Sequence, residues 1–370
     1  MNLLIDMSCI NAKNVYASIP TYITKLVDSF YSNGISNISL LADISQFKSY
    51  TQRYPNYKIY TIKRNYLLYR IPIISDLYAR YTYKKALSKI NCDTVLIASD
   101  QDRGTIAEIT QKKIIVIHDL KGIKTNSRII NLINLAFYQK LINQASTVVA
   151  ISGCTKKDII QYLSISGNKI HIIPNSVSLS KSSTQIKGIP NKYILYVNTL
   201  QPHKNVQTLI AAYNECKVKN DYKLVIVGKE TSFWKNQVKL LIKQNKLEQN
   251  IIHLKDLSNE ELHYVYENAS LFITTSLHEG FGYTPIEAAI CGVPVISSTS
   301  EALKESTQGL LNYYEPANDY ISLSKKIDEI ISTPQSKASL DAIAEKLKKD
   351  YSPETQLNRF IYITNSLNQG

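Results

Sequence analysis

The sequence is poor in cysteine and contains no long apolar run. Its five cysteines are odd in number and widely spaced, and no two of them form a CxxC pair, which suggests neither a disulfide framework nor a zinc site. No stretch approaches the roughly 18 uninterrupted apolar residues of a membrane-spanning helix. No basic-then-apolar leader precedes NLLID. We therefore expect a cytoplasmic protein whose cysteines are small buried residues: Cys9, Cys92, Cys154, Cys216 and Cys291.

Acidic residues are scarce in the first half of the chain only. The formal net charge is +13. Residues 1–185 hold 23 Lys and Arg against 10 Asp and Glu, whereas residues 186–370 hold 20 of each kind. This asymmetry predicts a domain boundary near residue 185 and an anionic partner for the first domain.

The chain has no internal repeat and no low-complexity tract, and its length predicts two domains. With 370 residues, 44% of them apolar, it exceeds one ordinary domain. The polar stretch SLSKSSTQIKGIPN, residues 178–191, is typical of a linker. We predict an N-terminal domain of residues 1–185 and a C-terminal domain of residues 186–370. A last helix at about 353–368 can pack back on the N-terminal domain.

Short β-branched segments alternate with segments of helical length in both halves. The β-branched segments, such as TVLIAS and YKLVIVG, are apolar nearly throughout, which indicates parallel sheets covered by helices on both faces. We predict an α/β fold of two doubly wound, Rossmann-like domains in tandem. Ligands of such sheets collect at the carboxyl ends of the strands, so the chemistry is expected in a cleft between the domains. The predicted helices include 20–32, 128–145, 205–219, 233–247 and 259–268.

One segment of the second half, HEGFGYTPIEAAICGVPVIS at residues 278–297, carries two glutamates, Glu279 and Glu287. It follows the predicted strand SLFITT, and its helix is expected to have Thr284 as N-cap and Gly292 past its end. Two interpretations stay open. Thr284 and Glu287 have the spacing of a capping box. Alternatively, the free amides of the helix N-terminus and the carboxylates bind a ligand's anionic groups and hydroxyls.

Other segments accompany this turn in a recognisable order. They are IVIHDL, VVAISGCTKKDI and IHIIPNSV in the first half, then YILYVNTLQPHKN and LVIVGKE in the second. Together with the Glu-x7-Glu turn, they resemble retaining glycosyltransferases of the GT-B type, specifically family 4 (glycosyl transferases group 1). The resemblance covers about residues 95–330 and implies two Rossmann-like domains with the nucleotide-sugar bound by the second.

The resemblance assigns roles to individual residues. Glu287 would bind the ribose hydroxyls of the donor, and Glu279 would lie near the donor sugar and the β-phosphate. Lys204 would offset the charge that builds on the leaving diphosphate, and His118, at the end of a first-domain strand, would contact the transferred sugar. We therefore take Glu279, His118 and Lys204 as catalytic candidates. The candidates for donor binding are Glu287, His203, Gly280, Phe281, Gly282, Tyr283, Thr284, Asn198 and Gly228.

The sequence departs from the family pattern at several turns. Asn198 in VNT stands where a glycine is usual, His203 stands where an arginine is usual, and Ser176 replaces the glycine of an IPNG turn. The first-domain loop, NVYASIPTY, has Ser18 and Pro20 in place of small flexible residues. Because that loop usually covers the diphosphate or the acceptor, the departures bear on acceptor specificity.

Asp100 and Asp102 form an Asp-x-Asp after the strand TVLIAS, a pattern that holds a divalent metal in another class of glycosyltransferases. It lies far in sequence from the predicted phosphate site, so we favour no metal and no cofactor. The resemblance implies a UDP- or GDP-linked sugar as donor and front-face displacement, in which the leaving phosphate takes the acceptor proton.

The favoured function is a retaining glycosyltransferase. It would move a hexose, with mannose as one candidate, to a lipid-linked or growing glycan of a bacterial surface polysaccharide (O-antigen, capsule or exopolysaccharide). A non-catalytic relative that only binds nucleotide-sugars is the alternative. A nucleic-acid-binding protein is a remote one, because the 26 tyrosines are not interleaved with basic residues on a recognisable module. Phosphorylase relatives are disfavoured, since no pyridoxal motif is present.

The segment 63–90 combines basic, apolar and tyrosine residues. Ile74, Leu77, Tyr78 and Tyr81 follow helical spacing, with Arg80 and Lys84 predicted on another side. An ordinary domain helix with solvated charges accounts for the segment taken alone. Because the whole net charge lies in this domain, we instead predict peripheral attachment to the anionic inner face of the cytoplasmic membrane.

Overall fold

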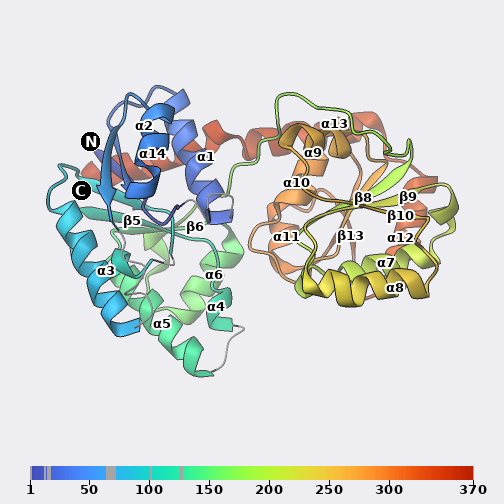
Figure 1. Ribbon diagram of the computed structural model, residues 1–370, viewed down its shortest axis with the longest axis horizontal. Helices are drawn as coiled ribbons and strands as arrows, with labels where there is room; N and C mark the ends of the chain where they lie inside the picture. Colours follow the sequence, from blue (N-terminus) through green and yellow to red (C-terminus); the bar gives the residue numbers. More distant parts are fainter. Residues whose placement is uncertain are drawn as a thin grey trace. The chain divides into compact units, whose positions relative to one another are not determined.

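The computed structural model describes residues 2–11, 14, 18–63, 72–100, 102–124 and 128–369. The chain divides into two compact units, Met1–Asn175 with Pro353–Gly370 and Ser176–Ser352, each built around one sheet (Figure 1). The predicted α/β fold of two doubly wound domains is confirmed. The predicted cleft between the domains depends on their relative placement and stays a prediction.

The first unit contains a seven-stranded sheet in the order β3-β2-β1-β4-β5-β6-β7, with every described strand pair parallel. β1, β4 and β6 are buried along their whole length, as expected for strands covered on both faces. The strands are β1 (Leu3–Met7), β2 (Ile38–Asp43), β3 (Lys58–Ile62), β4 (Thr94–Ile97), β5 (Lys112–Ile117), β6 (Thr147–Ala150) and β7 (Ile170–Ile172).

The helices of the first unit cover both faces of this sheet. α3, η3, α5 and α6 contribute buried residues to one core cluster with the strands, whereas α1 packs against α14. The helices are α1 (Ser18–Ser32), α2 (Phe47–Arg53), α3 (Pro72–Leu87), α4 (Lys121–Lys124), α5 (Arg128–Asn143), α6 (Gly153–Tyr162) and α14 (Pro353–Gln369), with the short 3-10 helices η1 (Ile44–Gln46), η3 (Arg103–Ile106) and η4 (Gly167–Lys169).

The second unit contains a six-stranded parallel sheet in the order β10-β9-β8-β11-β12-β13. The strands are β8 (Tyr193–Val197), β9 (Lys223–Val227), β10 (Ile251–Leu254), β11 (Leu271–Thr274), β12 (Val295–Ser298) and β13 (Asn312–Tyr314). The helices are α7 (Val206–Glu215), α8 (Lys239–Gln244), α9 (Asn259–Glu267), α10 (Tyr283–Ile290), α11 (Glu301–Ser306), α12 (Tyr320–Ser332) and α13 (Lys337–Asp350), with η5 (Pro202–Lys204), η6 (Lys217–Asn220) and a π-helical turn η7 (Trp234–Val238).

The boundary between the units differs from the predicted one at residue 185. The polar segment after Ser176 belongs to the second unit, because its backbone bonds to helices of that unit. Val177 N donates to Tyr351 O at 2.8 Å, and Thr184 N donates to Glu260 O at 3.1 Å. Polar composition made this segment resemble a free linker, although its hydrogen bonds fix it on the surface of the second unit.

The C-terminal segment belongs to the first unit, not to residues 186–370 as a whole. Helix α14 is joined to the unit by hydrogen bonds at its beginning: Ser29 Oγ donates to Pro353 O at 3.2 Å, and Gln356 Nε2 donates to Pro174 O at 2.9 Å. The sequence allows a tail helix at 353–368 to pack in this way. The physical reason is its apolar side, which packs against α1.

The five cysteines are free thiols, but only Cys92 and Cys216 are buried. Cys9, Cys154 and Cys291 are half-buried, so the expectation of five buried cysteines is wrong for these three. Among the described residues, no helix is both long and apolar enough to span a membrane.

In the described part of the chain, the segment between β4 and β5 carries the short helix η3. A buried lysine of β5 holds this segment in place. Lys113 is 2% exposed. Its Nζ donates to Thr105 O at 3.1 Å, to Ala107 O at 2.5 Å and to Gln144 Oε1 at 2.7 Å. Burial lowers the pKa of Lys113 to about 8. These bonds fix η3 on the sheet between α3 and α5.

Candidate functional site

The 3-10 helix η5 follows β8 at the carboxyl edge of the second sheet and is fixed there through its carbonyl groups. Tyr196 Oη donates to Lys204 O at 2.9 Å. Thr275 Oγ1 lies within hydrogen-bond distance of the same oxygen, at 3.0 Å, and of Asn205 O, at 2.9 Å. Leu277 N donates to His203 O at 2.9 Å. The predicted phosphate-binding residues His203 and Lys204 are therefore held against the end of β11.

The catalytic candidates Lys204 and Glu279 form an ion pair. Lys204 Nζ lies 2.7 Å from Glu279 Oε1, and each side chain is 13% exposed. Ser276 Oγ donates to the same oxygen at 2.8 Å. At this degree of burial, the pair attracts more strongly than an exposed one. The lysine charge is thus kept at the strand edge and is balanced within the protein.

Asn198 and Gly228 lie at the ends of the neighbouring strands β8 and β9. Asn198 Nδ2 approaches Ser276 Oγ at 3.4 Å, which connects it to the Lys204–Glu279 pair. A Cβ atom on Gly228 would lie 2.2 Å from Asn198 O, so only glycine permits this approach. The structure therefore brings Asn198, Gly228, Lys204 and Glu279 to one edge of the sheet.

The turn at residues 280–282 leads into α10 by a route that differs from the predicted one. The helix begins at Tyr283, and its N-cap is Gly282, with φ of +90° and no side-chain cap. A Cβ on Gly282 would also lie 2.3 Å from Leu303 Cδ2. Thr284 is therefore inside the helix, and the predicted capping box is wrong. The left-handed Gly282 ends the loop two residues earlier than the predicted N-cap Thr284.

Glu287 lies in the second turn of α10, where it is half-buried. Tyr266 Oη, from α9, donates to Glu287 Oε2 at 2.8 Å. Burial, followed by the negative charge of Glu287, raises the pKa of Tyr266. The glutamate is thus oriented by a neutral phenol from a neighbouring helix.

The aromatic residues of the turn support the backbone. Phe281 is buried and packs edge-on against Tyr283 and Tyr351, with ring centroids 5.3 Å apart in both pairs. Gly280, Tyr283 and Thr284 are half-buried. The ring of Phe281 is therefore part of the packing beneath the turn, and ligand binding by the turn amides stays a prediction.

His118 belongs to the first unit, where it follows β5. Its Nε2 lies 2.9 Å from Ala98 O, and the ring of Tyr22 packs edge-on at 4.8 Å between centroids. Burial lowers the pKa of His118, so the imidazole is neutral at pH 7. His118 thus belongs to the first unit, whereas the other two catalytic candidates, Lys204 and Glu279, belong to the second.

Asp100 and Asp102 of the Asp-x-Asp pattern both interact with groups of the first unit. Asp102 accepts a hydrogen bond from Gly104 N at 2.9 Å and caps η3. Asp100 is buried, and its pKa is raised to about 7, mainly by burial and secondly by Asp119, while a hydrogen bond from Tyr138 opposes the rise. In the described part of the chain, no three His, Cys, Asp or Glu residues form a metal-sized group. Gln101 lies outside the described residues.

Sequence reasoning missed Ser276, Thr275 and Tyr266. Thr275 and Ser276 are the hydroxyl residues that end the apolar segment SLFITTS. Their position at the carboxyl end of a predicted strand could have identified them as site residues. Nothing in the sequence pairs Tyr266 with Glu287, which is 21 residues away.

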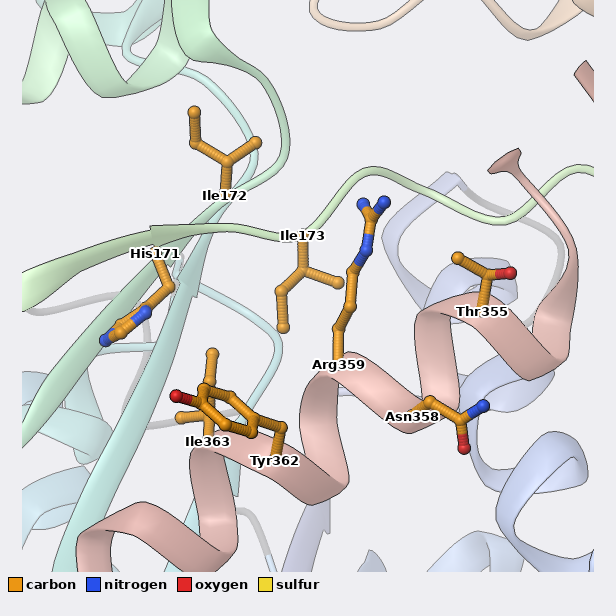
Figure 2. Close-up of a pocket in the computed structure, with 8 residues that line it drawn as sticks. All are labelled: His171, Ile172, Ile173, Thr355, Asn358, Arg359, Tyr362 and Ile363. Carbon is orange, nitrogen blue, oxygen red and sulfur yellow. The ribbon is translucent and has the colours of Figure 1, made fainter. Parts of the chain in front are cut away.

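A pocket of about 400 Å³ lies elsewhere, in the first unit, between β7 and α14 (Figure 2). No predicted site residue lines it. Its lining residues are His171, Ile172, Ile173, Thr355, Asn358, Arg359, Tyr362 and Ile363.

Two family models match the chain. The model of glycosyl transferases group 1 matches residues 181–347, and that of Glycosyltransferase Family 4 matches residues 51–181. The two matches meet at residue 181, five residues after the second unit begins at Ser176.

Two curated relatives are bacterial glycosyltransferases. The chain is 27% identical to the O-antigen chain mannosyltransferase RfbU of Salmonella typhimurium over 226 residues, covering 60% of this chain and 62% of RfbU. It is 29% identical over 189 residues to the N-acetylgalactosamine-N,N'-diacetylbacillosaminyl-diphospho-undecaprenol 4-alpha-N-acetylgalactosaminyltransferase of Campylobacter jejuni, covering 49% of this chain and 50% of that enzyme. The chain thus spans less than two thirds of each relative.

The fold is shared with HepE of Anabaena, whose crystal structure contains UDP and glucose. The TM-score is 0.75 at 15% identity, and the match covers 99% of this chain and 100% of HepE. At 15% identity, the similarity shows a shared fold only.

Replacing Lys204 tests the ion pair. Lys204→Met should lower the free energy of unfolding by about 2–3 kcal/mol, because Glu279 keeps its charge in a largely buried place without its partner. Adding Glu279→Gln should restore at least about 1 kcal/mol of that loss. Urea unfolding of both single variants and the double variant measures the coupling. Additive losses would show that the two side chains do not interact.

Replacing Asp100 tests its raised pKa. A carboxyl whose folded pKa of about 7 exceeds its ordinary value of 3.8 stabilises the fold below pH 4 and loses that contribution as pH rises through 7. Asp100→Asn removes the loss, so the variant should gain up to about 4 kcal/mol over wild type at pH 8 and little at pH 4. Urea unfolding between pH 4 and pH 8 measures the difference. A constant difference across this range would contradict the raised pKa.

Proposed function

We propose that this chain, which belongs to the glycosyltransferases of group 1 and family 4 with the GT-B fold, transfers a hexose from a UDP- or GDP-linked donor with retention of configuration. The acceptor would be a lipid-linked or growing glycan of a bacterial surface polysaccharide. Mannose is the favoured sugar, because RfbU is a mannosyltransferase.

The observation that carries this proposal is the cluster of Lys204, Glu279 and Ser276 at the carboxyl edge of the second sheet. Breaking the bond between the sugar and the diphosphate builds negative charge on the leaving phosphate. Lys204 is already oriented there, so its charge stabilises the leaving group without a large rearrangement. Preorganised charges of this kind typically contribute a few kcal/mol to the barrier reduction.

The backbone at the start of α10 supplies a second set of donors. The first amides of a helix lack partners within the helix and lie at the positive end of its dipole. Gly282, with its positive φ, lets the chain enter the helix without a side chain over these amides. This arrangement fits the sugar and phosphate oxygens of a nucleotide-sugar.

Glu287 would bind the nucleoside. Its carboxylate is half-buried and oriented by Tyr266, and a carboxylate fixed in this way accepts hydrogen bonds from two vicinal hydroxyls. We assign the ribose to Glu287 and the sugar to Glu279.

The ion pair also bears on the stereochemistry that we propose. A nucleophilic carboxylate must be free to attack the anomeric carbon, whereas Glu279 accepts bonds from Lys204 and Ser276. We therefore assign Glu279 to positioning the donor sugar. The leaving phosphate would take the acceptor proton as the acceptor attacks from the same face.

The proposed acceptor is based on the names of two relatives and on the net charge of residues 1–185. RfbU is named for the O-antigen chain, and the Campylobacter enzyme for a diphospho-undecaprenol acceptor. An acceptor of that kind would bring the enzyme to the inner face of the cytoplasmic membrane. The excess of 13 positive charges in residues 1–185 favours such an anionic surface, and the first unit would receive the acceptor.

Replacing Glu287 tests nucleotide binding. Glu287→Ala should raise the dissociation constant of UDP or GDP, whichever binds wild type, at least tenfold, because a hydrogen bond to a charged group contributes about 1.5–3 kcal/mol. Glycosyl transfer should be lost. Calorimetric titration measures the affinity, and release of nucleoside diphosphate from a panel of donors measures the activity.

Two further variants make this experiment specific. Glu345→Ala removes an exposed carboxylate of the same unit and should leave the affinity unchanged. Tyr266→Phe keeps the carboxylate and removes the group that orients it, so it should weaken binding less than Glu287→Ala. An unchanged affinity in Glu287→Ala would refute the ribose assignment.

Metal independence is the second prediction from this assignment. If Lys204 and the helix amides offset the diphosphate charge, activity should survive an excess of chelator. Asp100→Ala combined with Asp102→Ala should also retain nucleotide affinity, measured by calorimetry. Loss of activity in chelator with recovery on adding manganese would show that a cation is needed.

A further inference from the structure

Helix α5 presents its apolar side chains to solvent. Ile129, Ile130, Leu132 and Ile133 are all exposed, and the outward stripe continues through Ala136 to Lys140. Positions 129, 132, 133, 136 and 140 have the spacing of one helix face. An outward face on an ordinary surface helix is polar, so packing within the unit does not account for these residues.

The inward face of α5 is also occupied. Phe137, Leu141 and Ile142 are buried in the core cluster of the first unit. Asn134, near the exposed isoleucines, turns toward the neighbouring helix, where its Nδ2 donates to Gly122 O at 3.0 Å. The polar side chain of Asn134 thus forms a hydrogen bond within the unit, whereas the neighbouring isoleucine and leucine side chains are exposed to solvent.

Helix α3 repeats this arrangement. Ile74, Leu77 and Tyr81 lie outward at helical spacing, and the same face continues into Lys84 and Lys85, which are exposed. Lys85 Nζ lies 5.7 Å from the ring centroid of Tyr81. Tyr78 and Arg80 are half-buried, so they do not belong to the outward face. Residues 64–71 of the predicted membrane segment lie outside the described residues.

The two helices are neighbours. η3 packs against both of them, and the guanidinium carbon of Arg103 lies 3.8 Å from the ring centroid of Phe137. α3 and α5 also lie side by side in Figure 1. Each joins two parallel strands, so their N-terminal halves, which carry the exposed isoleucines and leucines, lie at the carboxyl edge of the sheet. Tyr81 and the lysines lie in the C-terminal halves. His118 follows β5 at that same edge.

The concentration of exposed apolar residues is high. In the part of the chain that the structure describes, sixteen large apolar side chains are exposed, and seven of them lie on these two helices, between 47% and 72% exposed. Single exposed apolar residues are normal on a protein surface, whereas a contiguous group marks an interaction site. The seven are Ile74, Leu77, Tyr81, Ile129, Ile130, Leu132 and Ile133, which we call the α3–α5 face.

The charge around the α3–α5 face has one sign. Helix α5 contains Arg128 and Lys140 and no acidic residue, and α3 contains one acidic residue, Asp76, against Arg80, Lys84 and Lys85. A second copy of the chain would place an equally basic face opposite this one, which is repulsive. An anionic lipid leaflet offers both the opposite charge and an apolar interior.

We propose that the α3–α5 face inserts into an anionic bilayer surface, with the isoleucines and leucines entering the acyl boundary and the lysines contacting lipid phosphates. This inference deepens the proposed function. It rests on that function in one respect, namely that the acceptor is lipid-linked and approaches from the membrane. Both helices would then lie along the leaflet, and the carboxyl edge of the first sheet, where His118 lies, would be beside it. The headgroup end of a lipid-linked acceptor would reach that edge without leaving the membrane.

Vesicle flotation with the whole chain tests the proposal without any sugar donor. The chain should float with vesicles of phosphatidylglycerol and phosphatidylethanolamine, and not with phosphatidylcholine vesicles. Raising the salt from 0.1 M to 1 M, which shortens the Debye length from about 10 Å to about 3 Å, should weaken binding strongly.

Paired variants separate this surface from the rest of the molecule. Ile129→Ser with Ile133→Ser, and Lys84→Glu with Lys85→Glu, should each lower the vesicle partition coefficient at least tenfold. The matched controls are Leu240→Ser with Ile321→Ser, which are 53% and 42% exposed, and Lys337→Glu with Lys348→Glu, exposed lysines of the second unit. Both controls should bind vesicles as wild type does. All substituted residues are exposed, and circular dichroism verifies that each variant is folded.

Three results would overturn the proposal. They are no flotation of wild type with anionic vesicles, equal flotation of wild type and both α3–α5 variants, and conversion of a wild-type dimer to a monomer by Ile129→Ser with Ile133→Ser without vesicle binding. Titration of the same variants with UDP or GDP keeps the two proposals distinguishable. A variant that loses vesicle binding but keeps its nucleotide affinity leaves the transferase assignment intact.

Discussion

The second unit depends on one buried charge and its partner. Lys204 and Glu279 are 75 residues apart in the sequence, and their contact joins the segments that follow β8 and β11, which are neighbouring strands. The carbonyl of Lys204 is held by Tyr196 and Thr275, so both the backbone and the side chain of this lysine are fixed. A largely buried ammonium group is tolerated because a carboxylate balances it. The same arrangement holds the Lys204 ammonium group at the strand edge, where we propose that the leaving phosphate forms.

The strands of the two sheets could be predicted because most of them are apolar along their whole length. Short apolar runs that alternate with helical segments are typical of parallel strands covered on both faces. The glutamates of the turn and Lys204 could be located because the motif fixes their sequence positions. The helix start could not be predicted. Thr284-Pro285 has the composition of a cap, but the close approach of Leu303 selects Gly282 and its positive φ. That contact crosses 21 residues and leaves no mark in the local sequence.

The orientation of α5 could not be predicted either. RIINLINLAFYQKLIN is apolar around most of its circumference, so periodicity does not say which side meets the sheet. The buried side of α5 consists of Phe137, Leu141 and Ile142. The ring of Phe137 fills the space beside η3, where the guanidinium group of Arg103 stacks on it. Lys113 sets the position of η3 through hydrogen bonds to Thr105 O and Ala107 O, and it also binds Gln144 just after α5. The outward direction of Ile129 and Ile133 is thus decided partly by a lysine on a buried strand.

The division of the first unit between two segments affects its synthesis. The second unit is one continuous segment, Ser176–Ser352, whereas the first unit is completed by Pro353–Gly370. A ribosome makes the whole second unit before it makes α14, and domains fold as their residues emerge. The later part of the sequence can therefore finish folding before the earlier part. Until α14 arrives, α1 leaves uncovered the surface that this helix will occupy, and the nascent first unit must stay soluble with that surface open.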